Sequence, residues 1–434
     1  MTADPGVAEP STRLTPAQRK AILAGAIGNT VEWVDWAIYT ALASVFAGQF
    51  FPSGDRTAGL LATLAVFAAG FLMRPIGGAV LGAYADRHGR KKALTLTIGL
   101  MAGAALVIAA CPTYRAIGVA APIILLLARL VQGFSAGGEF ASSSAFLVES
   151  SAPGRRAFAG SWQQVSVGLG TLIAAFMSFV LTSTLSDDAM AAWGWRLAFA
   201  IGGLLGLVGL WLRTAVPETE SFRRISEGRT EPARGPILGM LREHPRAALR
   251  VVGITIAGTL TYYIWISYMP GYAHTVTGIP LNQALLANTL GIAYFLCLLP
   301  FVALLSDRFG RKPTLLAFAV GFVVIAYPAF ALLHLGGFWP LLGAELIGLT
   351  FLAGYSANCA TVLAEQFPAE VRTTGIGLPY ALAVAVFGGT APYLTTWMSA
   401  HGLSGWVWLY VTAGALVGVC VYAVMPETKD VELR

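Results

Sequence analysis

Several ionisable side chains lie inside long apolar stretches of this chain, where a charge is costly and usually faces a cavity or a partner. A carboxylate in a region of low dielectric constant has a raised pKa, and a nearby arginine lowers that pKa again. An acid whose partner changes between two conformations can therefore take up and release a proton. The side chains concerned are Glu32, Asp35, Arg74, Arg129, Glu139 and Glu345.

Glu32 and Asp35 lie three positions apart, so they share one face of a helix with Trp36 and Tyr39. This pattern predicts a coupling carboxylate, either Asp35 or Glu32, and we count Glu139 in the same proton-coupling set. The alternative is a structural ion pair with Arg74 or Arg129. The spacing alone leaves both interpretations open.

Arginine keeps its charge when buried and can hold a carboxylate through two parallel hydrogen bonds. Arg74 and Arg129 are therefore candidate anion-binding groups, and a substrate with two carboxylates would need a second one. Arg196 is a further candidate, although its place between Trp195 and an apolar run also fits an anchor at the membrane surface.

Aromatic side chains add possible hydrogen-bond donors to a substrate site. We expect Tyr39, Tyr262, Tyr263, Trp265 and Tyr380 to contribute to substrate binding. An aromatic belt at the membrane surface would explain the cluster at 262–268 equally well.

Composition places the chain among membrane proteins. Hydrophobic residues make up 56% of its 434 residues and charged residues 12%, which is too apolar for a soluble core of this size. The cysteines at 111, 297, 359 and 420 lie in apolar stretches without metal-ligand spacing, so we predict neither a disulfide nor a metal site. We find no nucleophile–base pair or phosphate loop, and therefore expect no enzyme and no cofactor apart from the proton.

The positions of Lys and Arg predict the orientation. If the N-terminus is cytoplasmic, the outside segments carry only Arg56, Arg115 and Arg196. We therefore predict both termini in the cytoplasm, in a multi-pass protein of the bacterial inner membrane. The same topology explains the net charge of +6 without nucleic acid.

The apolar runs predict twelve transmembrane helices, and repeated landmarks divide them into two halves. Asp86-Arg87-His88-Gly89-Arg90 returns as Asp307-Arg308-Phe309-Gly310-Arg311, and a Pro-Glu-Thr triplet follows both the sixth and the twelfth run. We predict an all-α membrane protein of two six-helix bundles. The expected parts are a tail at 1–19, bundles at 20–213 and 250–425, a cytoplasmic linker at 214–249, and a tail at 426–434.

Short motifs give the chain a family resemblance. The stretch Gly82–Lys92 resembles the loop signature of the major facilitator superfamily. The sequences around Gly28–Asp35, Arg129–Glu139 and Trp193–Arg196 resemble its metabolite:proton symporters, and those around Phe51–Gly54 and Phe67–Gly78 resemble the α-ketoglutarate permeases of that branch.

This resemblance implies a twelve-helix fold with a central cavity that opens alternately to the two sides. The expected function is proton-coupled import of a small organic acid, a dicarboxylate such as 2-oxoglutarate, by a protein that acts as a monomer. In such permeases the arginine matching Arg196 is associated with substrate binding, and the one matching Arg129 with proton coupling. A valine at 384, where relatives often have asparagine, leaves the substrate open.

The two repeated turns are expected to act as a gate rather than as a binding site. Arginines there can bridge carboxylates across the cytoplasmic side, and an aspartate can face the N-terminus of a neighbouring helix. The predicted gating residues are Asp86, Arg87, Arg90, Glu149, Asp307, Arg308, Arg311, Glu365 and Arg372.

Other functions remain as alternatives. A symporter of proline, betaine or another carboxylate such as shikimate, citrate or an aromatic acid would share the branch. A membrane receptor would bind without transporting, and nothing in it would require the buried charges.

Overall fold

The computed structural model describes residues 16–52, 54–88, 90–137, 139–149, 151–152, 154–214, 242–368 and 371–431. Within these residues, every regular element is helical. The helices of the N-terminal half are α1 (Pro16–Phe50), α2 (Arg56–Leu72), α3 (Arg74–His88), α4 (Arg90–Ala110), α5 (Tyr114–Ile117), α6 (Ala120–Ala136), α7 (Glu139–Glu149), α8 (Arg156–Thr184), α9 (Asp187–Ala189), η1 (Met190–Gly194) and α10 (Trp195–Thr214).

The C-terminal half continues the same pattern of long helices joined by short connections. Its helices are α13 (Pro245–Tyr262), η2 (Tyr263–Tyr268), α14 (Met269–Thr277), α15 (Leu281–Phe309), α16 (Arg311–Leu333), α17 (Phe338–Ser356), α18 (Cys359–Ala364), α19 (Arg372–Ala383), η3 (Val384–Gly388), α20 (Ala391–Ala400), η4 (Ser404–Trp406) and α21 (Val407–Val424).

Eleven helical stretches among the described residues are long and apolar enough to cross a membrane, and some of them join two or three of these helices end to end. The 35-residue α1 precedes them in the chain. Large apolar side chains such as Trp211, Leu249 and Val324 are exposed on the outer surface, as expected of a surface that faces lipid. The prediction of an all-helical, multi-pass membrane protein is confirmed.

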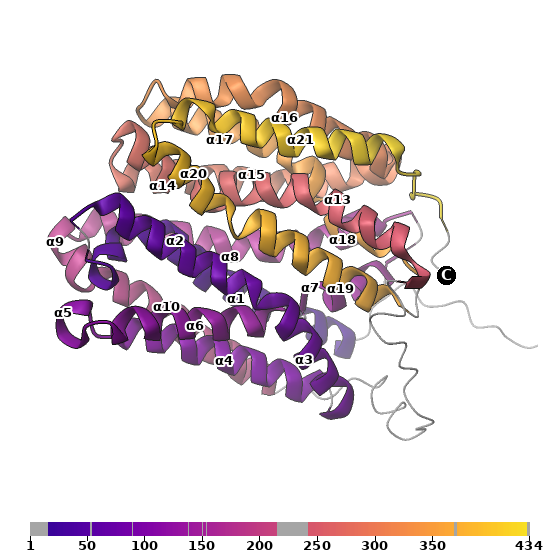
Figure 1. Ribbon diagram of the computed structural model, residues 1–434. Helices are drawn as coiled ribbons and strands as arrows, with labels where there is room; N and C mark the ends of the chain where they lie inside the picture. Colours follow the sequence, from indigo (N-terminus) through magenta and orange to yellow (C-terminus); the bar gives the residue numbers. More distant parts are fainter. Residues whose placement is uncertain are drawn as a thin grey trace, which may run out of the picture.

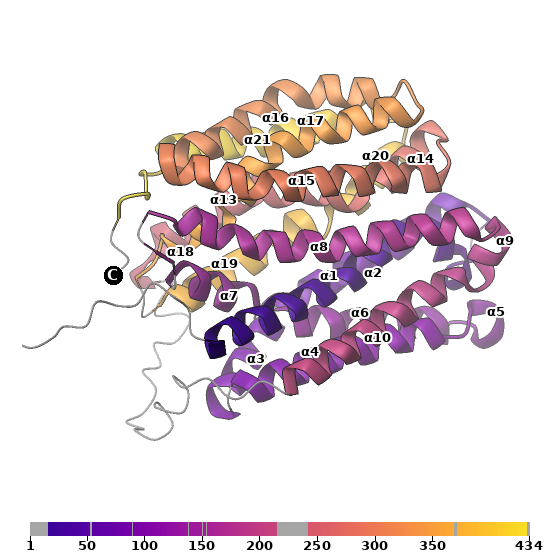
Figure 2. The same ribbon diagram turned by 180° about the vertical axis from the view of Figure 1, so that it is seen from behind.

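The two halves lie side by side, with the N-terminal helices in indigo and magenta and the C-terminal ones in orange and yellow (Figure 1). Helices α8 and α15 pack along each other where the halves meet, as the reverse view shows (Figure 2). The exact limits of the two bundles stay a prediction, and residues 215–241 of the expected linker lie outside the described residues.

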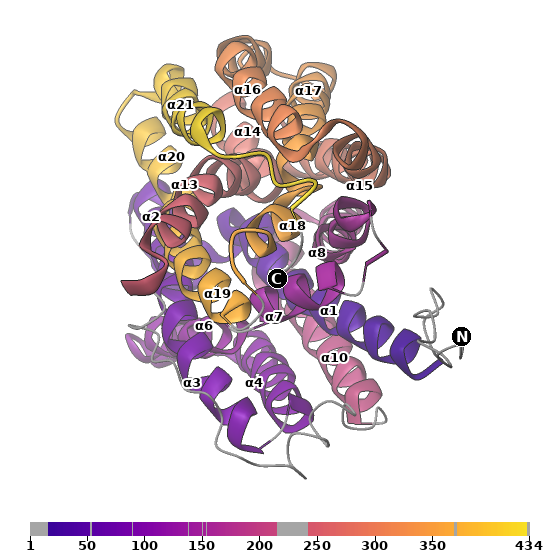
Figure 3. The ribbon, with the colours of Figure 1, turned by 90° about the vertical axis from the view of Figure 1, so that its right-hand side faces the viewer.

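The end of α15, with Asp307, lies beside the last described residues of the chain, because Lys429 Nζ donates to the carbonyl of Arg308 at 2.8 Å. We call this end of the molecule, which faces the viewer in Figure 3, the Asp307 end. Helix α8 begins there, because the backbone N–H of Ala157 donates to Asp307. Helix α1 runs from this end to the opposite one, where Gln49 Nε2 donates to the carbonyl of Ala191 at 3.0 Å. The directions of α1 and α8 show how far each of their side chains lies from the Asp307 end.

A break in the second membrane-crossing stretch positions Arg74. Helix α2 ends at Leu72 and α3 starts at Arg74, next to Pro75, which has no backbone N–H to continue the hydrogen-bond ladder. The same region packs backbone to backbone against α6. A Cβ added at Gly133 would lie 1.7 Å from the carbonyl oxygen of Gly70, and one at Gly137 would lie 2.0 Å from that of Arg74. Only glycine fits at these two positions, which fixes Arg74 relative to Arg129 on α6.

Candidate functional site

Asp35 and Arg129 form a buried ion pair inside the N-terminal half. Arg129 Nη1 lies 2.9 Å from Asp35 Oδ2, and their side chains are 0% and 5% exposed. The same nitrogen also donates to Gln132 Oε1. Asp35 Oδ1 and Arg129 Nε and Nη2 have no hydrogen-bond partner within the described part of the chain. A buried pair joined by a single hydrogen bond is incompletely stabilised.

Aromatic rings enclose this pair. The guanidinium of Arg129 lies 3.9 Å from the ring centroid of Tyr39 and 4.7 Å from that of Trp36. The Tyr39 hydroxyl donates to the carbonyl of Thr63 at 2.8 Å, so it is already engaged. Tyr39 was expected to bind substrate, but the structure places it beneath the ion pair as a packing partner of Arg129.

Arg74 lies in a pocket between the two halves. Its guanidinium stacks over Phe71 at 4.1 Å and over Trp36 at 4.5 Å, measured to the ring centroids. The side chain is 7% exposed, and its Nε and Nη2 find no hydrogen-bond partner among the described residues. The pocket is lined by Asn29, Glu32, Trp33, Arg74, Ala136, Gly137, Phe140, Ala141, Gly377, Tyr380, Ala381 and Val384.

The C-terminal half contributes tyrosines from α13, η2 and α19. Tyr262 and Tyr263 are buried against Trp33, at centroid distances of 6.1 and 6.3 Å, and neither hydroxyl has a hydrogen-bond partner in the described residues. The Tyr263 hydroxyl lies beside Arg74. Tyr380 stacks on Phe140 of α7 at 4.0 Å. Of these three tyrosines, Tyr380 lines the pocket, while the π-helical turn η2 at Tyr263–Tyr268 interrupts the regular helix directly after Tyr262.

Two expected substrate residues lie elsewhere. Arg196 donates to the carbonyls of Cys111 and Ala192, both at 2.9 Å, at the end of the molecule opposite Asp307. Trp265 is fully buried within the C-terminal half, where its Nε1 donates to the carbonyl of Ala344 at 3.1 Å. These partners hold both side chains away from the pocket of Arg74.

A second buried carboxylate, Glu345, lies within the C-terminal half. It is 0% exposed and accepts a hydrogen bond from Asn288 Nδ2 at 3.4 Å. Its Oε2 has no hydrogen-bond partner in the described residues, and none of the described ion pairs includes it. The structure does not bring it to the pocket of Arg74.

The Asp307 end carries a cluster of charges that joins the halves. Asp307 accepts hydrogen bonds from the backbone N–H groups of Ala157 and Phe158, both at 2.9 Å, and pairs with Arg311 at 2.8 Å. Glu365 pairs with Arg311 at 3.2 Å and, across the halves, with Arg156 at 3.6 Å.

Burial raises the pKa of the Glu365 carboxyl, against the opposing influence of Arg311, Thr428 and Arg156. Arg372 pairs with Glu149 across the halves. Arg308 is exposed and lies over Phe309, outside this cluster. The side chains of Asp86, Arg87, Arg90 and Glu139 lie outside the described residues.

Sequence reasoning missed several contributors. Trp33 and Phe71 flank Arg74, Gln132 holds Arg129, and Arg156 reaches Glu365 from the other half. Trp33 stands next to Glu32 in the sequence, and Gln132 lies one helical turn after Arg129. Their position next to a candidate charged residue was the signal in the sequence that could have identified Trp33 and Gln132.

Comparison with known proteins identifies the family. Residues 25–378 match the model of the Major Facilitator Superfamily. The chain belongs to this superfamily. It is 39% identical to "Alpha-ketoglutarate permease" of Escherichia coli (strain K12), with 92% of each chain covered.

Other members of the superfamily are also similar. The chain is 36% identical to the "Citrate-proton symporter" of Klebsiella pneumoniae, covering 87% of this chain and 84% of the relative. It is 34% identical to the "Proline/betaine transporter" of Escherichia coli (strain K12), covering 96% and 85%. Among solved structures, the partially occluded inward-open xylose transporter XylE of E. coli has a TM-score of 0.72 at 19% identity, covering 96% of this chain and 99% of that one. The twelve-helix fold of two bundles is that of this superfamily.

Proposed function

We propose that this member of the superfamily is a proton-coupled symporter that imports a small organic acid by alternating access. The expected substrate is a dicarboxylate such as 2-oxoglutarate. The observation that carries the proposal is Arg74, a buried arginine with two unpartnered nitrogens facing a pocket between the halves. The similarity to an alpha-ketoglutarate permease and a citrate-proton symporter supports a carboxylate as substrate.

The pocket offers donors that suit a carboxylate. Arg74 supplies a planar pair of N–H groups. The hydroxyl of Tyr380, which lines the same pocket from the other half, adds a second donor, and that of Tyr263, beside Arg74, adds a third. A substrate bound to all three would join the two halves, and its release would let them separate. This is how binding can control which side of the pocket opens.

The ion pair of Asp35 and Arg129 is the proposed proton site. When Asp35 binds a proton, its attraction to Arg129 weakens, and Trp36 transmits the change because it contacts both Arg129 and Arg74. Proton binding and substrate binding therefore act on one connected set of side chains. The proton is the coupling ion of this proposal, and no other cofactor enters it.

The orientation belongs to the same proposal. The excess of Lys and Arg in the loops supports a cytoplasmic location for the Asp307 end and for both termini, in the bacterial inner membrane. The charge cluster formed by Asp307, Arg311, Glu365 and Arg156 would then close the pocket from the cytoplasm. We propose the monomer as the transporting unit, since both halves of the pocket come from one chain.

A zwitterionic osmolyte is the second candidate, and one observation favours it. Glu32 lines the same pocket as Arg74, so a cation and a carboxylate face one substrate. A proline or betaine derivative would place its carboxylate on Arg74 and its ammonium near Glu32. A dicarboxylate would instead require Glu32 to be protonated.

Uptake of labelled 2-oxoglutarate into proteoliposomes tests the proposal. We expect an inward proton gradient to drive uptake, a protonophore to abolish it, and unlabelled dicarboxylates to compete. Arg74→Gln should raise KM by about 10- to 100-fold, the effect of losing a hydrogen bond to a charged group. Arg196→Gln is the matched control and should leave KM unchanged. Competition by betaine or proline alone would replace the dicarboxylate with a zwitterion, and binding without flux would exclude a transporter.

A further inference from the structure

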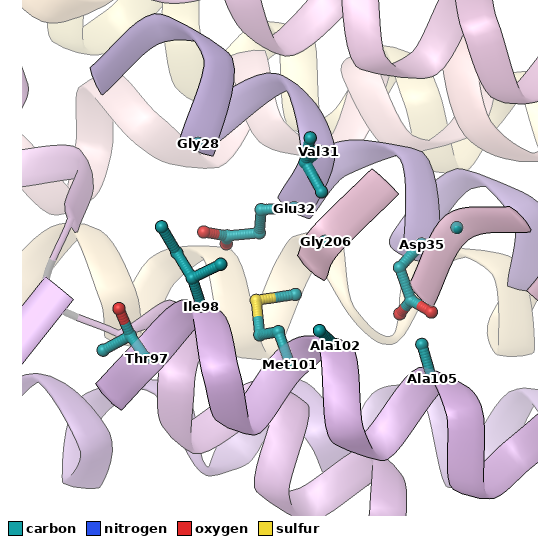
Figure 4. Close-up of a pocket in the computed structure, with 11 residues that line it drawn as sticks. Gly28, Val31, Glu32, Asp35, Thr97, Ile98, Met101, Ala102, Ala105 and Gly206 are labelled. Atoms are coloured by element: carbon teal, nitrogen blue, oxygen red, sulfur yellow. The ribbon is translucent and has the colours of Figure 1, made fainter. Parts of the chain in front are cut away.

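A crevice inside the N-terminal half is separate from the pocket of Arg74. It lies between α1, α4 and α10, and both Glu32 and Asp35 point into it (Figure 4). Its other described lining residues are small or apolar, apart from one threonine. They are Gly28, Val31, Thr97, Ile98, Met101, Ala102, Ala105, Gly202 and Gly206.

Glu32 connects the two spaces. Among the described residues, it is the one that lines both the crevice and the pocket of Arg74. Asp35 lies one helical turn further along α1, so the two carboxylates are neighbours on one face of the helix. A proton on either of them can therefore be passed to the other over a short distance.

The crevice also has a direction. From Asp35 through Glu32 to Gly28 it follows α1 for about 10 Å toward the Asp307 end, at a rise of 1.5 Å per residue. Thr97 lines it on α4 at the same end, and Ala105 faces Asp35 at the other (Figure 4). The crevice thus leads away from the ion pair without passing through the pocket.

The charged and titratable groups around these carboxylates come from four elements. Arg129 of α6 and Tyr39 of α1 face Asp35. Arg74 of α3 and Tyr263 of η2 lie on the pocket side of Glu32. The described crevice-lining residues of α4 and α10 carry no charge. A charge on Glu32 is therefore felt mainly by Arg74.

We infer that the crevice is a pathway for protons alone, which branches from the substrate pocket at Glu32. Glu32 relays protons along it between Asp35 and the Asp307 end. In each transfer, the proton leaves the Asp35 carboxyl and joins the Glu32 carboxylate, and Asp35 is left as the anion paired with Arg129. Glu32 then releases the proton to water at the Asp307 end. The inference deepens the proposed function and rests on it: substrate leaves through the central pocket, while the proton leaves through the N-terminal half.

The arrangement explains why the proton and the substrate depend on each other. Protonated Glu32 is neutral and leaves Arg74 available to a carboxylate substrate. Ionised Glu32 competes with that substrate for Arg74 and repels it. Among the described lining residues of α4 and α10, the one side-chain donor is Thr97, and its hydroxyl already donates to the carbonyl of Leu94. The crevice is therefore poorly suited to hold an organic anion, so the two routes stay distinct.

The variant Ala105→Leu tests this proton pathway, because the larger side chain would cover Asp35 on the crevice side. Ala110→Leu, the same substitution at an exposed position of the same helix, is the control. Two readouts are compared in proteoliposomes: net uptake driven by a proton gradient, and exchange of internal for external substrate, which requires no net proton movement. We expect Ala105→Leu to slow net uptake by about tenfold or more, equivalent to about 1.4 kcal/mol, and to leave exchange intact.

The outcomes separate this inference from the proposed function. If the unmodified protein shows no proton-driven uptake, the proposed function fails. If it does, and Ala105→Leu retains that uptake or loses exchange equally, a branch specific for protons is excluded. Glu32→Gln provides a second variant: it should abolish the response of uptake to the proton gradient, while 2-oxoglutarate still binds, because a neutral side chain at position 32 leaves Arg74 available. A Glu32→Gln variant that is still driven by the gradient would exclude Glu32 as the relay.

Discussion

Asp307 of the C-terminal half caps the first turn of α8 in the N-terminal half, with its Oδ2 lying 2.9 Å from the backbone nitrogen of Phe158. A carboxylate at a helix N-terminus satisfies N–H groups that have no partner within the helix, and it opposes the positive end of the helix dipole. The contact therefore holds the two halves together at one end of the pocket.

Asp307→Asn should loosen this end. The amide keeps the shape of the side chain but loses the charge that holds both α8 and Arg311, so we expect the free energy of unfolding to fall by about 1–3 kcal/mol. A thiol reagent should also reach cysteines introduced at this end of the pocket faster. Thermal unfolding of the purified protein and the labelling rate measure the two effects. Asp430→Asn, at an exposed position, serves as the control. An equal effect of that variant would show that the loss of stability does not come from the contact between Asp307 and α8.

The Arg372–Glu149 pair should respond unequally to the loss of either partner. The Glu149 side chain is 45% exposed, so Glu149→Gln is expected to cost less than about 1 kcal/mol. Arg372 is buried and its Nε also donates to the carbonyls of Ala364 and Phe367, so Arg372→Gln should cost about 2–3 kcal/mol. Thermal unfolding of both single variants is the measurement. Equal losses would mean that the ion pair alone, and not the bonds to the carbonyls, sets the contribution of Arg372.

Removing one partner of the buried Asp35–Arg129 pair should be worse than removing both. Arg129→Gln leaves a carboxylate without its cation in the apolar interior, at an expected cost of about 3–5 kcal/mol. Adding Asp35→Asn should restore most of the stability, because the double variant has no buried charge there. The double variant should fold yet show no proton-driven uptake. Monodispersity in size-exclusion chromatography and melting temperature test the first point, and the transport assay tests the second.

Glu427 gives a prediction about pH. It accepts hydrogen bonds from the backbone N–H groups of Arg311 and Lys312 at 2.9 and 3.0 Å. Burial alone would raise the pKa of Glu427, but these bonds and those from Thr428 and Lys429 outweigh burial and lower it. The carboxylate therefore stabilises the fold above its ordinary pKa of about 4.3, and this contribution is lost as the pH falls through the lowered value.

Glu427→Gln should accordingly lower the free energy of unfolding by about 1 kcal/mol at neutral pH, as expected for the loss of a helix cap. The difference from the unmodified protein should shrink as the pH falls below about 4. Thermal unfolding at both pH values, with Glu243→Gln as an exposed control, measures it. A difference that persists in acid would show that the charge of Glu427 is not responsible.

Much of the fold and the centre of the site followed from composition and from isolated charges. Apolar runs separated by basic turns predicted the membrane helices. A membrane span needs apolar side chains, and the short cytoplasmic loops between spans collect Lys and Arg. Asp35, Arg74 and Arg129 stood out since a charge in an apolar run needs a partner, and the structure supplies one for Asp35 and Arg129 and a pocket for Arg74. The repeated turn at Asp307 and Arg311 predicted a contact between the halves, which the structure contains.

The sequence alone could not show which side chains reach the pocket of Arg74. Sequence shows how far along a helix a residue lies, but not toward which neighbour it points. Arg196 and Trp265 were assigned to the substrate, but Arg196 is held by the carbonyl of Cys111 on a neighbouring segment and Trp265 by that of Ala344. Trp33 and Phe71 were overlooked because their importance depends on Arg74, which the break before Pro75 brings to them. Such contacts depend on helix rotation, which periodicity alone does not determine.

The glycine contacts of α6 limit which parts of the molecule can move relative to each other during transport. Because Gly133 and Gly137, in and just after α6, lie in backbone contact with Gly70 and Arg74, these segments cannot slide past each other without a clash. Arg74 and Arg129 must then travel as parts of one rigid body. The distance that changes during a transport cycle is the one between this body and the tyrosines of the opposite half, so a pair of spectroscopic labels should be placed across that boundary.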